Sequence, residues 1–178
     1  MTIFWQRIIR AAKLDASLYE EVEKDARALP QAMGVVILSA VAAGIGVIFQ
    51  IRVGMAGILF GAFAGLISWY VWALLTYWIG TKLLPEPQTK ADLGELLRTI
   101  GFSSSPGLIR VLGVIAGSGR IVFSLAAAWM FVAMVIAVKC ALDYKSIWRA
   151  VGVCLIGWVV QALLLAFLLT LFGGFSTA

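Results

Sequence analysis

The chain has 178 residues, of which 62% are hydrophobic and only 13% are charged. A soluble domain is about half apolar and about a quarter charged, so this excess of apolar side chains must face lipid rather than water. The net charge of +5 comes from basic residues that lie between apolar runs. That placement indicates membrane topology and contact with anionic lipids, and it argues against binding of nucleic acid.

The residue types exclude several kinds of catalytic and metal site. The sequence has no histidine, which excludes His-ligated haem, most catalytic zinc sites and His-based triads. Its two cysteines, Cys140 and Cys154, lie in apolar runs without a metal-binding spacing, so we interpret both as structural thiols. There is also no phosphate-binding glycine loop and no nucleophile elbow. We therefore expect a protein that is not an enzyme and that uses no metal or cofactor.

Residues 1–30 predict a cytoplasmic amphipathic segment. Phe4 and Ile8 share one face of a first helix, while its basic residues lie on other faces, a pattern typical of a helix on the membrane surface. Residues 15–29 predict a second helix, with Asp15 as N-cap and an end near Pro30. Its acidic residues form either a solvated face or a partner-binding face.

Residues 31–178 predict an all-α polytopic membrane bundle with about five transmembrane helices. The apolar runs that predict the spans are 31–50, 53–79, 100–116, 121–138 and 150–172. Most have the length that a bilayer requires. The third is weak because it holds three serines, a proline and an arginine, so it must be short, broken or shielded by neighbours.

A segment outside the membrane, residues 81–99, separates the second and third spans. Thr89 and Asp92 in this segment predict a capping box that starts a short helix through Leu97.

The basic residues predict the orientation. Five spans place 11 of the 14 on the side of the N-terminus and only Arg52 and Arg120 on the other side. The positive-inside rule then puts the N-terminus in the cytoplasm and the C-terminus on the opposite side of the membrane. The predicted cytoplasmic loop before the fifth span carries Asp143, Tyr144, Lys145, Trp148 and Arg149.

A stripe of small residues lies on one face of the second span: Gly57, Gly61 and Gly65 recur every four residues. Such a stripe lets another helix approach closely. Ala40 and Gly44 of the first span offer a matching face. The stripe therefore serves either the hairpin of spans one and two or a contact between two copies of the chain.

Four residues form a candidate polar site inside the membrane: Ser105, Pro106, Arg110 and Gln161. Pro106 interrupts the helical hydrogen bonds of the third span. A charge such as that of Arg110 costs at least about 2.5 kcal/mol within a span. Arg110 either lines a polar site or snorkels to the outer interface. Gln161 either joins two spans by a hydrogen bond or belongs to a transport site.

Two stretches carry a resemblance to a known family. Residues 101–113, GFSSSPGLIRVLG, and residues 129–158, from WMFVAMV to CLIGW, resemble the third to fifth spans of Yip1-domain membrane proteins, particularly the bacterial branch. The resemblance covers about residues 15–172 and implies five spans with a cytoplasmic N-terminus. The likeness to the bacterial branch implies a bacterial cytoplasmic (inner) membrane, with the C-terminus in the periplasm. In eukaryotes the family implies association with Rab GTPases. The N-terminal segment here is short, so we carry over the architecture and not Rab binding.

Together these patterns favour a non-enzymatic membrane protein that works as a scaffold, a homo-oligomer or an accessory subunit of a larger membrane complex. The alternative is a small channel or transporter with a polar site at the broken third span, because interrupted helices often mark substrate sites.

Overall fold

The computed structural model describes residues 2–48, 54–115 and 117–173, and the regular structure in these ranges is all helical, which confirms the predicted fold class. Arg52 and residues 49, 50, 53 and 116, at the ends of predicted spans, lie outside the described residues. The elements are α1 (Ile3–Ala12), α2 (Ala16–Lys24), the 3₁₀ turn η1 (Ala26–Ala28), α3 (Leu29–Gly46), α5 (Met55–Trp78), the π-helical turn η2 (Ile79–Leu83), α6 (Leu93–Phe102), the 3₁₀ helix η3 (Ser105–Val114), α7 (Gly119–Ala141) and α8 (Ile147–Gly173).

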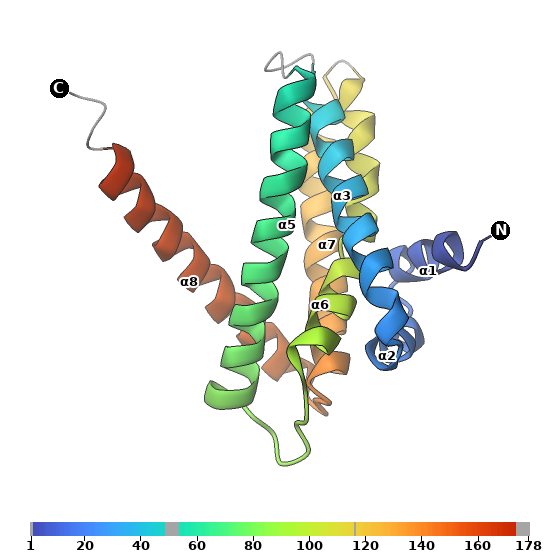
Figure 1. The fold of residues 1–178 in the computed structure, drawn as a ribbon, viewed down its shortest axis with the longest axis vertical. Coiled ribbons are helices and arrows are strands. Elements are labelled where there is room, and N and C mark those ends of the chain that lie inside the picture. Colours follow the sequence, from blue (N-terminus) through green and yellow to red (C-terminus); the bar gives the residue numbers. More distant parts are fainter. Residues whose placement is uncertain (1, 49–53, 116, 174–178) are drawn as a thin grey trace.

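The chain passes along the bundle five times, and each passage reverses the direction of the one before (Figure 1). Within the described residues, four helical segments are long and apolar enough to cross a membrane: Ala26–Gly46, Met55–Leu83, Gly119–Ala141 and Ile147–Leu164. The other passage is made by α6 and η3 in succession. The third predicted span is therefore a broken helix between four continuous ones.

As drawn in Figure 1, α2 lies against the lower part of the bundle, and α1 lies nearer its middle and roughly crosswise to it. Asp15 is the predicted N-cap, since its side chain accepts a hydrogen bond from the backbone N–H of Ser17. The prediction of a helix up to Pro30 was wrong. The helix stops at Lys24, and Pro30 stands in the first turn of α3, where a missing N–H costs no hydrogen bond.

The segment that connects α5 to α6 also differs from the prediction. The capping box uses Asp92 and Glu95, each of which hydrogen-bonds the backbone N–H of the other. The helix does not end at Leu97 outside the membrane but continues to Phe102. It becomes the first half of the third passage because its apolar face, including the fully buried Leu96, packs into the bundle.

Two clusters of buried side chains hold the fold together. One joins α5, α6, α7 and α8 around Leu96, Val138 and Val153. The other joins α2 to the membrane helices, with Leu18 and Phe102 both fully buried in it. The N-terminal segment therefore shares a hydrophobic core with the bundle.

Candidate functional site

The break in the third passage lies between Phe102 and Ser105. The hydroxyl of Ser103 donates to the carbonyl O of Ile100 at 2.7 Å, and Pro106 has no N–H to continue an α-helix. The chain goes on as the 3₁₀ helix η3, which rises about 2.0 Å per residue against 1.5 Å in an α-helix. Two ten-residue helices therefore extend roughly 35 Å together, enough to cross a membrane.

Arg110, on η3, points toward the first span. Its Nη2 donates to the hydroxyl of Ser39 at 2.6 Å and to the carbonyl O of Ser39 at 3.1 Å, and its Nε donates to the carbonyl O of Gly107 at 3.0 Å. Ser39 stands seven residues before the end of α3. The guanidinium is therefore held inside the bundle, roughly 10 Å from that end.

The close approach of η3 to α3 requires glycine. A Cβ on Gly46 would lie 2.1 Å from the carbonyl O of Arg110, and a Cβ on Gly107 would lie 2.2 Å from the hydroxyl of Ser39. A larger residue at Gly46 would force the two backbones apart, and one at Gly107 would displace the Ser39 hydroxyl that Arg110 contacts.

Arg110 lines a cavity of about 800 Å³ that is bounded by α3, α5, the α6–η3 passage, α7 and α8. Gln161 also lines the cavity and donates to the hydroxyl of Ser68 at 3.3 Å. The walls are otherwise mainly apolar and aromatic, with Trp69, Trp72 and other large side chains. Two of the four predicted polar residues, Arg110 and Gln161, thus face one cavity.

Ser105 and Pro106 are buried near the break and are not among the residues that line the cavity. The hydroxyl of Ser105 has no hydrogen-bond partner among the described residues. Both residues shape the third passage rather than face the open space.

The small-residue stripe lines the same cavity: Gly57, Gly61, Gly65, Ala40 and Gly44 all border it. A Cβ on Gly65 would lie 3.3 Å from the Cβ of Ala40, so this position packs against the first span. A Cβ on Gly61 would meet nothing within 4 Å. The stripe therefore serves the hairpin at one position and leaves open space at another.

The predicted cytoplasmic loop before α8 is fixed to the α5–α6 connection. The hydroxyl of Tyr144 lies 2.9 Å from the carbonyl O of Gly80 and 2.7 Å from that of Leu84. Burial raises the pKa of Tyr144 to about 12. Tyr144 thereby occupies carbonyl groups that the end of η2 leaves without helical partners.

Glu86 joins the same two loops. Its carboxylate accepts from the backbone N–H of Lys145 at 3.0 Å and lies 3.4 Å from Nε of Arg149. The carbonyl O of Asp143 accepts from a glutamine side chain of the α5–α6 connection at 3.0 Å. Trp148, in contrast, is 79% exposed. Four of the five predicted loop residues therefore hold two connections together, and Trp148 is free for other contacts.

Comparison with protein families identifies the chain, because the sequence model of the Yip1 domain matches residues 16–174. The chain belongs to the Yip1 family. It is a multi-pass membrane protein of a family that is generally non-enzymatic. Comparison with curated proteins and with solved structures gave no significant match. The matched range covers α2 to α8 and the whole cavity, whereas α1 lies outside it.

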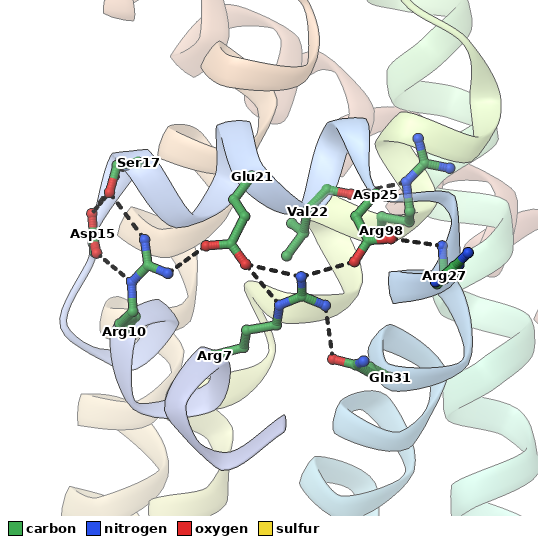
Figure 2. Close-up of polar contacts among 10 residues, drawn as sticks. All are labelled: Arg7, Arg10, Asp15, Ser17, Glu21, Val22, Asp25, Arg27, Gln31 and Arg98. Atoms are coloured by element: carbon green, nitrogen blue, oxygen red, sulfur yellow. Dashed lines mark hydrogen bonds and ion pairs between the residues drawn. The ribbon is translucent and has the colours of Figure 1, made fainter. Parts of the chain in front are cut away.

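In this Yip1 protein, α1 is tied to α2 by a network of ion pairs (Figure 2). Arg7, only 7% exposed, contacts Glu21 at 2.9 Å, Asp25 at 2.8 Å and Gln31 at 3.1 Å. Its guanidinium lowers the pKa of Asp25 below the usual value. Arg10 adds ion pairs to Glu21 and to the N-cap of α2. Glu21 and Asp25 of the acidic face thus form ion pairs within the chain. The sequence had suggested either a solvated face or a partner-binding face, and neither interpretation included these ion pairs.

Two further contacts anchor this segment to the Yip1 bundle. Arg98 of α6 donates through Nε to the carbonyl O of Val22 at 2.9 Å and through Nη2 to that of Glu23. The indole N–H of Trp129 on α7 donates to the carbonyl O of Ala12 at 2.8 Å. The ends of both N-terminal helices are therefore bonded to membrane helices.

Glu23 lies in a second, smaller and mainly polar cavity of about 340 Å³. It is 9% exposed, and its Oε2 has no hydrogen-bond partner among the described residues. Burial, followed by the charges of Asp143 and Glu95, raises the pKa of Glu23 to about 7. The other ionisable residues that line this cavity are Glu20, Lys24, Lys139, Cys140, Asp143 and Tyr144.

Three residues that complete these sites were not identified from the sequence: Ser39, Ser68 and Glu86. Ser39 carried a usable signal, because it is the one hydroxyl in the apolar run 31–48 and a lone polar group in a span needs a partner. Glu86 stands between two prolines, and no spacing rule relates it to a loop 60 residues away. Its role depends on how the two connections meet.

Proposed function

We propose that this Yip1 protein is a non-enzymatic membrane protein that acts by assembly, as an oligomer or as an accessory subunit of a membrane complex. The observation that carries this proposal is the course of α8. Ala150, Val153 and Cys154 are fully buried in the bundle. Beyond them the helix runs obliquely away from α5 (Figure 1).

The outer face of α8 carries large aliphatic side chains that the bundle leaves uncovered. Ile156, Val159 and Leu163 lie on the side opposite the cavity and are 38%, 53% and 66% exposed. Lipid can cover such side chains, but a second helix would add close dispersion contacts that fluid acyl chains do not give. A second copy of the chain is the occupant that we propose, because one self-complementary surface is enough for a two-fold dimer.

Disulfide cross-linking in native membranes tests the assembly. In a Cys140→Ala, Cys154→Ala background, Val159→Cys places a thiol on the outer face of α8. Gly157→Cys is the matched control, because a Cβ at this position faces Trp72 at 3.4 Å. We expect a covalent dimer from Val159→Cys and none from Gly157→Cys. Native mass measurement must agree, and a strictly monomeric particle without partners would contradict the proposal.

A second candidate function is that of a small channel or transporter, with the cavity at Arg110 as its polar site. The observation in its favour is that Arg110 and Gln161, from two different passages, face one open space. Flux across liposomes with wild-type protein and Arg110→Ala tests it. Equal flux in both proteins, or none in either, would remove this candidate.

For the location we propose a bacterial inner membrane, with the N-terminus in the cytoplasm and the C-terminus in the periplasm. In Figure 1, α2 and the connections before α6 and α8 lie toward the lower end of the bundle, and α1 lies nearer its middle. These segments hold most of the basic residues. Anionic lipids of the cytoplasmic leaflet would contact them. Thiol labelling of Lys90→Cys and Arg120→Cys in intact cells tests the orientation. An impermeant reagent should label only Arg120→Cys.

A further inference from the structure

The large cavity has the form of an apolar slot that is open at the bundle surface. Its α5 wall runs from Gly57 to Trp72, a length of roughly 22 Å at 1.5 Å per residue. Gly57, Gly61 and Ser68 are exposed although they line it. A slot of this length exceeds half the thickness of a bilayer core, which is about 15 Å. It can therefore receive a hydrocarbon chain from the surrounding lipid.

Among the described residues that line the slot, Arg110 is the one that carries a charge. Its described hydrogen bonds all go to neutral oxygens, those of Ser39 and Gly107. None of the ion pairs among the described residues includes it. A guanidinium has five N–H donors, so donors remain for a further acceptor.

The chain itself has no acidic residue that could neutralise Arg110. All nine are in the N-terminal segment, in the α5–α6 connection with the start of α6, or in the loop before α8. The acidic residues of the N-terminal segment are in and next to α2, which lies with the two connections toward the lower end of the bundle as drawn in Figure 1, whereas η3 ends toward the upper end. A cation in the hydrocarbon region is costly, and neutral oxygens alone offset the charge of Arg110 within the described residues, so an anion from outside the chain would complete its compensation.

We propose that the slot binds an anionic phospholipid, with its phosphate on Arg110 and an acyl chain along the glycine stripe of α5. The planar fork of an arginine matches phosphate oxygens, and such charge-assisted hydrogen bonds are strong in a low dielectric. A small hydrophilic anion would satisfy Arg110 but would leave the apolar walls unfilled. A phospholipid supplies both an anion for Arg110 and an acyl chain for the walls. Its phosphate would lie deeper in the membrane than the neighbouring headgroups.

This inference rests on the cavity of the second candidate function, although a bound lipid requires no flux. Absence of flux with lipid binding intact would remove transport alone. Loss of the lipid preference would overturn this inference and leave the assembly through the outer face of α8 untouched.

Native mass spectrometry of the full chain from nanodiscs that contain phosphatidylglycerol and phosphatidylethanolamine tests the proposal. We expect one phosphatidylglycerol per chain to persist after detergent exchange. Arg110→Gln should weaken its retention about tenfold, as expected when a charge-assisted hydrogen bond is lost, while Arg110→Lys should retain part of it. Arg120→Gln is the matched control, since it removes an exposed basic residue at the same end of the bundle.

A second variant tests the slot without touching the charge. Gly61→Leu places a side chain into open space, because a Cβ there meets nothing within 4 Å. It should exclude the lipid while the protein keeps its thermal stability. Equal phosphatidylglycerol retention by wild type, Arg110→Gln and Gly61→Leu would overturn the proposal. So would saturation of the site by inorganic phosphate or by oleate in place of the phospholipid.

Discussion

Replacement of Arg7 by glutamine tests how firmly the N-terminal helices are held to the bundle. The Arg7 side chain is 8% exposed and contacts Glu21 and Asp25, whose side chains are 39% and 32% exposed. Loss of one partner from a fully buried ion pair costs about 3–5 kcal/mol. Both carboxylates here retain access to water and can be rehydrated. We therefore expect a smaller loss, about 2–3 kcal/mol of the free energy that holds α1 against α2.

Hydrogen–deuterium exchange in detergent micelles measures this loss directly. A decrease of 2–3 kcal/mol corresponds to roughly 30- to 150-fold faster exchange in α1, because these amides exchange when the helix separates from the bundle. Amides of α7 should keep their protection. Lys13→Gln is the matched control, since it removes an exposed positive charge from the same segment. If Arg7→Gln changed exchange in α1 no more than Lys13→Gln does, the ion-pair network would not be what holds this helix.

Three further variants test the loops, the polar cavity and the broken passage. In the folded protein the pKa of Glu23 is about 7, above its ordinary 4.5. Ionisation of this carboxyl therefore lowers the free energy of unfolding as the pH rises from about 4.5 through 7, and the total loss is about 3 kcal/mol. Glu23→Gln should therefore raise the melting temperature at pH 8 and leave it unchanged at pH 4.5. Glu20 is exposed, so Glu20→Gln should change the melting temperature much less. Equal changes in Glu23→Gln and Glu20→Gln would refute the argument that burial raises the pKa of Glu23. Tyr144→Phe removes the one hydroxyl that lies within hydrogen-bonding distance of the Gly80 and Leu84 carbonyls and should cost about 1–2 kcal/mol. The loss should appear as a lower melting temperature and as faster proteolysis of the α5–α6 connection; unchanged proteolysis would contradict the link. Gly46→Ala must move α3 away from the carbonyl O of Arg110, which would lie 2.1 Å from the new Cβ. A cost of about 1–3 kcal/mol is expected in thermal unfolding, and a neutral result would show that the two helices do not approach so closely.

The sequence predicted the third passage only in part. Pro106 and the three serines before it correctly indicated a break, because they act on the backbone within a few residues. The start of the passage at Leu93 was missed. Whether Leu93–Phe102 lies outside the membrane or within the bundle depends on what covers its apolar face, and that face is covered by helices distant in the chain.

For Arg110, too, the sequence predicted one property and left another open. Its position in an apolar run marked it as a residue that needs compensation, but its partner Ser39 is 71 residues away. Hydropathy does not specify the rotation of one helix relative to another, so the choice between snorkelling and an inward contact was open. The glycine stripe left a similar choice, because small residues permit a close approach without selecting the helix that makes it.

The sequence by itself determined that this protein is a helical, multi-pass membrane protein of the Yip1 family, with four continuous spans and one broken span. These properties follow from hydropathy, prolines and local motifs, which act over one or two helical turns or the length of one span. Only the tertiary structure decided that Arg7 binds the acidic face of α2 and that Glu86 joins two loops. It also decided that Arg110 and Gln161 line one slot, which α8 borders. Those contacts depend on the tilt, rotation and separation of helices far apart in the chain, which side-chain packing sets and local sequence patterns do not encode.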